Sequence, residues 1–599
     1  MSSSSIEALK ALRLVLQHQG LAAYIVPSND PHQSEYAPAH WKLLEWISGF
    51  TGSAGTVVIT ATEAQVWTDG RYFLQAEKEL QGSPFQLKKQ QVANAPEHID
   101  WLAENLPAGS VVGCDGQLFS IQQVLHIEKR FEAKGIELDA QLDLLGPLWP
   151  ERPALPQTLI FEQDLYFAGA SRADKLRDIR VEMKQQKCAY HLVCTLEDIA
   201  WVLNLRGNDV PFNPVFVAYL IIGKSEAWLF VDSTKIPQTL YEQLQQDGVR
   251  LMPYSTIEFF CSTLSDRQSI LIDPGSCSLQ LYYQLDHLRI KEGEHLIRNR
   301  KAVKNHAERY HLKAAMRKDG VALVRAFRWL EDALQQEDTY PSEYDFAQKI
   351  AACRAEQADY FSESFSAIVG YNANGAIIHY RPHPEDSARI QPQGMLLVDS
   401  GGQYLDGTTD ITRTIALSEP SAQQRLHFTL VLKGMIALSR AIFPQGTVGI
   451  QLDALARQHL WQHQLNYNHG TGHGVGAFLS VHEPPQGFAS NLSTSRGTTA
   501  LLPGHLCSNE PGYYLTGEYG IRIENLILCA AQTPEESSDF LHFETLTLFP
   551  IDVQLIDRSL LDATEIQWLN DYHQKVFSEL SPLLEGAELQ WLEEKCQAI

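Results

Sequence analysis

The first 150 residues alternate between helical and strand patterns of apolar residues. Apolar positions at helical spacing predict helices over residues 6–19 and 120–134. Short runs rich in β-branched residues predict strands at 21–26, 56–60 and 65–68. This alternation is typical of an α/β domain. Prolines then punctuate residues 146–157, and because proline disfavours both helices and central strands, we predict a linker and a first domain covering 1–150.

The next segment repeats the first in outline. Residues 57–69 resemble residues 219–232 at a constant offset of 163, which matches Ile59 with Ile222. Two hairpins with short polar turns can also look alike by chance. We predict a second α/β domain over 151–302, and since neither copy contains a cluster of metal-binding or nucleophilic residues, we expect both to serve as scaffold.

Beyond residue 302 the apolar positions follow long amphipathic helices, which begin a third domain at 303–599. The basic run from Arg298 to Lys304 is interpreted as a solvated helix face or linker. All of the candidate chemistry lies downstream of this run.

Composition narrows the class of protein. The 599 residues carry 48 basic and 72 acidic side chains, a net charge of −24, which gives no electrostatic footprint for nucleic acid or anionic lipid. The nine cysteines form no C-x-x-C pair, the N-terminus lacks a continuous apolar signal segment, and no window of eighteen residues is apolar throughout. We therefore expect a cytoplasmic protein that binds neither nucleic acid nor membrane.

An apolar strand at Met395 to Val398 runs into Asp399, turns through two glycines, and returns to Asp410. A turn centred between Tyr404 and Leu405 would place the two aspartates directly opposite each other in a hairpin. Opposed carboxylates in a half-buried hairpin are costly unless a cation lies between them. The alternative is that both are solvent-facing turn acids.

The second candidate segment, residues 467–485, places glycines at alternate positions around His469 and His473. So many glycines disfavour a helix, which excludes a helical zinc motif despite the i, i+4 histidines. In an extended chain both histidines point to one side, while the glycine side permits a close backbone approach. His482 follows closely, which favours a functional site over isolated structural histidines.

The third segment contains Glu510 before Pro511, and Arg522 alternating with Ile521 and Ile523 before Glu524. Proline holds the preceding residue extended, and the alternation places Arg522 and Glu524 on one face. An exposed cross-sheet ion pair would have the same pattern.

Together the candidates are four carboxylates and one imidazole: Asp399, Asp410, Glu510, Glu524 and His473. This oxygen-rich set suits Mn²⁺, Co²⁺, Fe²⁺ or Zn²⁺, and not a thiolate zinc site. Four negative charges balance two divalent ions. A metal pair about 3.5–4 Å apart can generate a bridging hydroxide and polarise a carbonyl.

These residues resemble the ligands of the pita-bread metallopeptidases, the family of methionine aminopeptidase, prolidase, aminopeptidase P and the metal-free creatinase. All five ligand positions match without substitution, and the segments around His379, His473 and His482 match as well. Within the family the chain is similar to the long aminopeptidases P. The resemblance implies two tandem creatinase-like α/β domains, then an α+β pita-bread catalytic domain with a C-terminal extension at about 540–599.

The resemblance also implies the chemistry. Two divalent ions, with Mn²⁺ expected, would support hydrolysis of the bond between any N-terminal residue and a penultimate proline, in a homodimer. Asp399 would bind one ion, His473 and Glu510 the other, and Asp410 and Glu524 both. Glu510 would act as general base and Arg522 would orient a ligand carboxylate. The residues expected to hold the substrate and stabilise the tetrahedral intermediate are His379, His469 and His482.

Two alternatives remain at the level of the sequence. A prolidase would cut only dipeptides, but it resembles a single N-terminal domain where this chain repeats two. A catalytically inactive module of the same fold would bind peptides or proteins, but such modules lose ligands and none is lost here.

Overall fold

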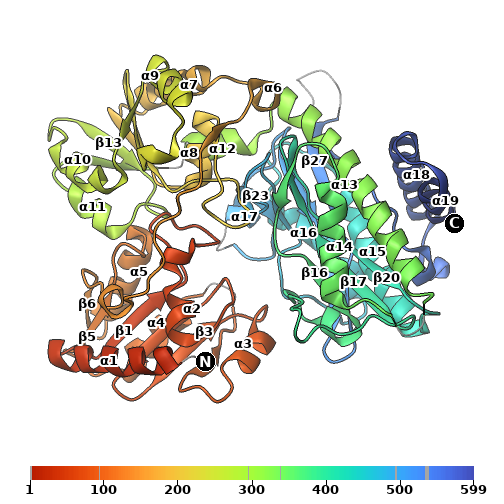
Figure 1. Ribbon diagram of the computed structural model, residues 1–599, viewed down its shortest axis with the longest axis horizontal. Coiled ribbons are helices and arrows are strands. Elements are labelled where there is room, and N and C mark those ends of the chain that lie inside the picture. The colour runs from red at the N-terminus through yellow and green to blue at the C-terminus, as the bar shows by residue number, and fades with distance from the viewer. Residues whose placement is uncertain (1–2, 93–94, 294–295, 337–338, 493–494, 533–538) are drawn as a thin grey trace. The chain divides into compact units, whose positions relative to one another are not determined.

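A computed structural model describes residues 3–92, 95–293, 296–336, 339–492, 495–532 and 539–599 (Figure 1). The chain forms two compact units. The N-terminal unit comprises Met1–Gln163, Ala170–Pro211 and Val215–Ile297, and the C-terminal unit comprises Asp164–Gly169, Phe212–Pro214 and Arg298–Ile599.

The N-terminal unit begins with a mixed sheet of strand order β4-β3-β2-β1-β5-β6. Its strands are β1 (Ala23–Pro27), β2 (Thr56–Thr60), β3 (Ala64–Thr68), β4 (Gln86–Lys89), β5 (Val111–Cys114) and β6 (Glu137–Asp139). One apolar core joins the sheet to α1 (Ser3–Gln19), α2 (Leu43–Ser48), α4 (Glu97–Asn105) and α5 (Ile121–Glu132). Both predicted helices and all three predicted strands are confirmed, with small shifts at their ends.

The second sheet has the same plan, with strand order β12-β11-β10-β8-β13-β14. Its strands are β8 (Tyr190–Val193), β10 (Tyr219–Gly223), β11 (Ala227–Phe230), β12 (Val249–Met252), β13 (Ser269–Ile272) and β14 (Arg289–Glu292). β10 and β11 pair antiparallel, as β2 and β3 do, and β13 lies parallel to β8, as β5 does to β1. The strands β2 and β10 are related by the predicted offset of 163 residues, so the tandem repeat is confirmed.

The prolines between the two sheets act as predicted. After the short turn η2 (Gly146–Leu148) the chain has no helix or strand until β7 (Phe161–Glu162). Helices α7 (Arg172–Gln185) and α8 (Leu196–Leu203) then precede and follow the first strand of the second sheet.

The C-terminal unit opens with two long helices, α13 (His306–Ala333) and α14 (Glu343–Ala355), as predicted. Each begins with a capping box, at Asn305 and at Ser342. Further along the chain α15 (Ala422–Ser439) packs against α16 (Gly449–Trp461), and these helices run beside strands in Figure 1. Among the described residues, no helix has the length and apolar character that a membrane crossing requires.

The strands of this unit that matter for the site belong to three sheets. One has the order β16-β17-β20, from β16 (Ile368–Tyr371), β17 (Met395–Ser400) and β20 (Ile411–Ala416). A larger one has the order β21-β28-β27-β24-β22-β23, from β21 (Ile442–Pro444), β22 (Gly472–Gly474), β23 (Glu483–Phe488), β24 (Leu506–Asn509), β27 (Asn525–Ala531) and β28 (Phe540–Thr545). A hairpin pairs β25 (Gly512–Leu515) with β26 (Tyr519–Arg522).

The predicted register of the first hairpin is wrong by two positions. Asp399 pairs with Thr412 instead of Asp410, and the turn closes where Tyr404 pairs with Gly407, so its tip is at Leu405 and Asp406. Side chains alternate along a strand with a period of two. A shift of two therefore leaves Asp410 on the same face as Thr412, and the two aspartates become diagonal neighbours on one face.

The interpretation of the basic run is also wrong for two of its lysines. Lys301, at the end of α12 (Leu296–Ala302), and Lys304 are both buried. Lys304 Nζ pairs with one oxygen of the buried Glu483 carboxylate, and Lys301 Nζ lies 3.7 Å from the other. In the sequence these charges resemble a solvated helix face. In the structure both lysines are buried beside the Glu483 carboxylate of β23.

Close helix packing gives a test of the fold at Gly434. Alanine in a helix interior normally stabilises by about 1 kcal/mol relative to glycine. Here a Cβ on Gly434 of α15 would collide with the carbonyl oxygen of Ala456 in α16. We expect Gly434→Ala to destabilise by about 1–3 kcal/mol, measured as a lower Tm in calorimetry. The exposed Gln423→Ala on the same helix is the control; a Tm at or above wild type for Gly434→Ala would contradict the packing.

Acid stability gives a second test, at His573. This side chain is buried on α18 (Ala563–Leu580), where desolvation, and then the Arg413 charge, lower its pKa to about 4. Because the folded-state pKa is below the unfolded value of about 6.5, the neutral form stabilises the fold above pH 6.5. This contribution, about 3 kcal/mol, is lost as the pH falls from 6.5 towards 4.

We expect His573→Gln to flatten the fall in unfolding free energy across that window, measured by urea unfolding at a series of pH values. The exposed His126→Gln on α5 is the control, and equal slopes for wild type and His573→Gln would contradict the prediction.

Candidate metal centre

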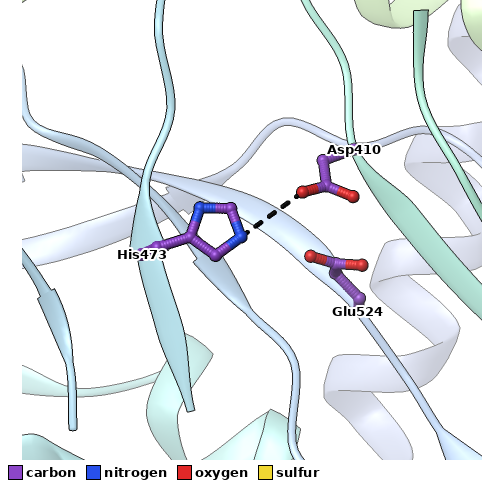
Figure 2. A group of neighbouring side chains, drawn as sticks. All are labelled: Asp410, His473 and Glu524. Carbon is purple, nitrogen blue, oxygen red and sulfur yellow. Dashed lines mark ion pairs between the residues drawn. The ribbon is translucent and has the colours of Figure 1, made fainter. Parts of the chain in front are cut away.

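Three buried side chains from distant parts of the sequence meet in the C-terminal unit (Figure 2). Asp410, His473 and Glu524 each offer a ligand atom, and these atoms lie within 4.8 Å of one another. His473 Nε2 is 3.5 Å from Asp410 Oδ2. Two carboxylates and an imidazole this close together, away from water, are a donor set for a divalent cation.

Strand β22 carries His473 between two glycines, and the structure explains both. A Cβ on Gly472 would collide with the Ser508 carbonyl oxygen, and one on Gly474 with the Glu483 carbonyl oxygen. The strand is thus pressed between β24 and β23, as the alternation of glycines predicted. His473 Nδ1 is 3.0 Å from the Gly474 carbonyl oxygen, so Nδ1 carries the proton and the Nε2 lone pair points at the acids.

Glu510 joins the cluster from the end of β24. Its Oε1 lies 3.4 Å from His473 Nε2. The hydroxyl of Ser508 donates to Glu510 Oε1 at 3.2 Å and accepts the backbone N–H of His473 at 2.9 Å. A single serine therefore sets the spacing between a predicted ligand strand and the predicted general base.

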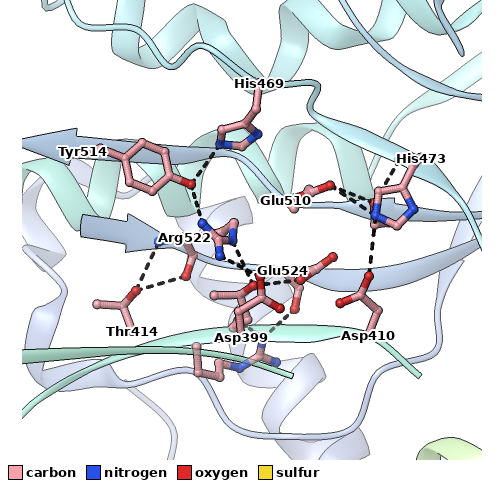
Figure 3. A network of polar contacts seen from close by, with 12 residues as sticks. Asp399, Asp410, Thr414, His469, His473, Glu510, Tyr514, Arg522 and Glu524 are labelled. Carbon is pink, nitrogen blue, oxygen red and sulfur yellow. Dashed lines mark hydrogen bonds and ion pairs between the residues drawn. The ribbon is translucent and has the colours of Figure 1, made fainter. Parts of the chain in front are cut away.

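Asp399 is tied to the cluster through Arg522 (Figure 3). Arg522 Nη2 donates to Asp399 Oδ2 at 2.6 Å, and its Nε donates to Thr412 Oγ1 at 3.1 Å. The Thr412 hydroxyl in turn donates to Glu524 Oε2 at 2.8 Å. Arg522 thus contacts one predicted ligand directly and a second through a threonine.

The two alternatives of exposed acids are wrong. Asp399 and Asp410 are both buried, so neither is a solvent-facing turn acid. Arg522 and Glu524 are buried as well, and the ion pair that Arg522 makes is with Asp399.

Tyr514 connects Arg522 to His469. Arg522 Nη1 donates to the Tyr514 hydroxyl at 2.6 Å, and that hydroxyl lies 2.9 Å from His469 Nε2. His469 Nδ1 faces the Gly470 carbonyl oxygen at 2.7 Å, so Nδ1 carries the proton. The Tyr514 hydroxyl thus links the His469 ring to the Arg522 guanidinium.

Burial and repulsion between neighbouring carboxylates both disfavour the ionised form of these acids. Desolvation, then the negative charges of neighbouring acids, raise the pKa of Asp410 and Glu524 well above the usual range. Desolvation also raises the pKa of Glu510 to about 7, although the Arg522 charge lowers it. Desolvation lowers the pKa of His473 well below its usual value, which keeps the imidazole neutral.

The residues therefore fit bound divalent ions. Asp399 Oδ1 is buried and has no hydrogen-bond partner within the described part of the chain. Together with the crowded acids it leaves negative charge and lone pairs that a cation would satisfy.

The other predicted histidines lie on two segments. The His482 ring stands perpendicular to that of His473, with ring centroids 4.3 Å apart. His379 is half-buried on the segment between β16 and β17.

Comparison with known proteins identifies the family. The chain is 40% identical to Aminopeptidase P2 of Arabidopsis thaliana, over 98% of this chain and 87% of the relative. It is 40% identical to Xaa-Pro aminopeptidase 1 of Dictyostelium discoideum, over 99% and 96%. The model of metallopeptidase family M24 matches residues 310–531. The chain belongs to metallopeptidase family M24.

Other matches cover the rest of this M24 chain. Creatinase/prolidase N-terminal domain models match residues 9–145 and 151–308, and a model of the C-terminal region of peptidase M24 matches 539–599. These matches and the two repeated sheets confirm the predicted fold: creatinase-like domains followed by an M24 catalytic domain.

A solved structure agrees over the full length. X-prolyl aminopeptidase from Caenorhabditis elegans, described as a cytosolic enzyme with a dinuclear active site, superposes with a TM-score of 0.94 at 34% identity, covering all of both chains. An Xaa-Pro dipeptidase from Bacillus anthracis, at 22% identity and a TM-score of 0.51, covers only 64% of this chain and shares the fold.

Sequence reasoning missed residues that hold the predicted ligands in place. Thr412 could have been found, since it lies two positions from Asp410 on the same strand face. Ser508 and Tyr514 are ordinary strand residues by pattern. The pairing of β22 with β24 brings Ser508 to His473, and the β25–β26 hairpin brings Tyr514 to Arg522.

Arg413 was missed as well. It is buried and donates to backbone oxygens on both sides of the site, at Thr412 (2.9 Å) and Glu524 (2.6 Å), and to the hydroxyl of Tyr572 on α18 (2.8 Å). It thereby ties the C-terminal extension to the short segment between β26 and β27 that carries Glu524.

Thr412 gives a test of this support. Thr412→Val keeps the shape but removes the hydroxyl between Arg522 and Glu524. Loss of such an outer hydrogen bond typically costs 10–100-fold in metal affinity, so we expect Mn²⁺ affinity to fall by at least about 10-fold. Calorimetric titration of the metal-stripped protein measures it. The control is Thr429→Val, a buried hydroxyl on α15 that bonds the Arg425 carbonyl oxygen; an equal loss in both variants would contradict the role of Thr412.

Proposed function

We propose that this protein is an Xaa-Pro aminopeptidase that hydrolyses the bond between any N-terminal residue and a penultimate proline. The proposal rests on the cluster of predicted ligands in a chain that matches Xaa-Pro aminopeptidases along its whole length. Ligand atoms of Asp410, His473 and Glu524 lie within 4.8 Å of one another, Glu510 Oε1 lies 3.4 Å from His473 Nε2, and Asp399 is linked to the cluster through Arg522. The prolidase alternative is disfavoured, because the dipeptidase aligns with 64% of this chain only.

Two divalent ions per chain are the proposed cofactors, with Mn²⁺ expected and Co²⁺, Zn²⁺ or Fe²⁺ as alternatives. His473 and Glu510 would hold one ion, Asp399 the other, and Asp410 and Glu524 both. When bound, such ions polarise the scissile carbonyl and make water acidic enough to be a nucleophile near neutral pH.

Glu510 is the proposed general base. Its Oε1 lies 3.4 Å from His473 Nε2, beside the predicted ligands, where the carboxylate could take a proton from water and give it up again. The proline nitrogen carries no hydrogen in the peptide. Like every amide nitrogen, it must gain a proton when the C–N bond breaks, and the Glu510 carboxyl, protonated in the first step, can supply it.

The histidines are proposed to hold the substrate and donate to the tetrahedral intermediate. His482 is close enough to His473 to act beside the ligands, and His379 is the candidate from the loop after β16. His469 is engaged by Gly470 and Tyr514, so a contact with substrate requires Tyr514 to release Nε2.

The remaining parts of the proposal concern organisation. We place the domains at 1–150, 151–302 and 303–599, with an extension at about 540–599, and expect a homodimer. A cytoplasmic location is supported by the nine cysteines, all free thiols in the structure, and by the cytosolic description of the C. elegans relative. Partners are peptides with proline at the second position, not nucleic acid or membrane.

Hydrolysis of Arg-Pro-Pro by metal-stripped and Mn²⁺-reconstituted protein tests the function. We expect activity only after reconstitution, with release of arginine from the tripeptide. Asp399→Ala and His473→Ala should each lower kcat/KM by at least about 100-fold, since a lost ligand costs more than a lost supporting group. Asp571→Ala, an exposed acid on α18, is the control. Cleavage restricted to dipeptides would favour a prolidase, and no activity with any metal would favour a binding module.

A further inference from the structure

The loop that carries His379 has little regular structure of its own. It joins β16 to β17 and contains only the short turn η5 (Asn372–Ala376) within its described residues. Loops of this length inside a compact domain are uncommon and are usually functional. Something outside the loop must therefore hold it in one conformation.

A buried carboxylate on α14 binds the loop at both ends and in the middle. Glu343, the first residue of α14, is 0% exposed. It accepts the backbone N–H of Tyr371 (2.7 Å) and of Ala388 (2.9 Å), the amide of Asn374 (2.9 Å) and the hydroxyl of Tyr380 (2.7 Å). Tyr380 is the neighbour of His379 in the chain.

The hydrogen bonds that Glu343 accepts explain how its carboxylate can be buried. A buried carboxylate is unfavourable unless hydrogen bonds replace its hydration. None of the described lysines or arginines forms an ion pair with Glu343, and its four partners are neutral groups that belong to the loop or flank it. The carboxylate and this one loop conformation therefore stabilise each other.

The start of the loop also lies on the strands of the metal centre. Gly375 of η5 approaches Gly520 of β26 so closely that a Cβ on Gly520 would collide with the Gly375 carbonyl oxygen. Strand β26 ends at Arg522, and β16 pairs with β17 so that Ile368 is opposite Asp399. The loop thus starts at β16, which pairs with the strand that carries Asp399, and its first turn packs against β26, which ends at Arg522.

We propose that Glu343 is a positioning residue for the reaction: by binding four points along the loop, it fixes His379 where it meets the substrate. This inference rests on the proposed function. A role in stability alone would make a different prediction, because the effect of Glu343 on catalysis would then be independent of His379.

A double-mutant cycle separates the two roles. Glu343→Gln keeps the size of the side chain but replaces one acceptor oxygen by a donor amide, which opposes the loop donors. We expect kcat/KM to fall about 10- to 100-fold, as for a catalytic group displaced by about 1 Å. In a His379→Ala background the same change should cost less than about twofold more, because there is no imidazole left to position.

Two further measurements do not depend on activity. Hydrogen exchange of the peptides covering residues 372–391 should become faster in Glu343→Gln, while the Mn²⁺ content of the reconstituted protein stays at the wild-type level. Asp345→Asn is the matched control, since this capping acid lies in the same helical turn and accepts from Ser342. We expect it to lower Tm without changing loop exchange or kcat/KM by more than about twofold.

Each outcome decides the proposal. A full additive loss in the double mutant, unchanged loop exchange, or an equal loss in Asp345→Asn would overturn it. Should Glu343→Gln fail to fold, Tyr380→Phe removes one of the four bonds and must show the same dependence on His379. If the wild-type enzyme does not cleave Xaa-Pro peptides, the proposed function fails first, and hydrogen exchange alone then decides whether Glu343 orders the loop.

Discussion

Repulsion among buried carboxylates is the constraint on which the C-terminal unit depends. Asp399, Asp410, Glu510 and Glu524 share a volume from which water is largely excluded, and Arg522 supplies one positive charge to them. Burying uncompensated charge carries a large free-energy penalty of desolvation. With all four acids ionised, the arrangement would be stabilised by further bound positive charge, which is why these residues fit divalent cations.

Around this centre, two buried arginines share one design, because each bonds several segments at once. Arg413 joins the segment that carries Glu524 to the C-terminal extension. Arg354 donates to Asp319, to Glu363 and to the hydroxyl of Ser400, the residue after Asp399. Such satisfied networks rigidify the elements they connect, and here those elements carry predicted ligands.

The N-terminal unit is organised differently, as two copies of one sheet. Its two sheets have the same strand order and the same mixture of parallel and antiparallel pairs. Both are built on apolar cores and short turns, and neither has a metal-type cluster among its described residues. Such a scaffold tolerates divergence, because apolar cores accept many combinations of side chains of suitable volume.

The sequence by itself determined the element types and the tandem repeat, and it named the candidate ligands. These follow from local periodicity and from rare residues at fixed spacings, which need no knowledge of distant partners. Only the tertiary structure decided the hairpin register, the burial of Lys301 and Lys304, and the roles of Thr412, Arg413 and Glu343. A register depends on where a turn closes, and a buried polar group depends on partners that are far away along the chain, 112 residues for Thr412 and Glu524. No local pattern contains either, because both are set by which strands pair and by what each pairing shields from water.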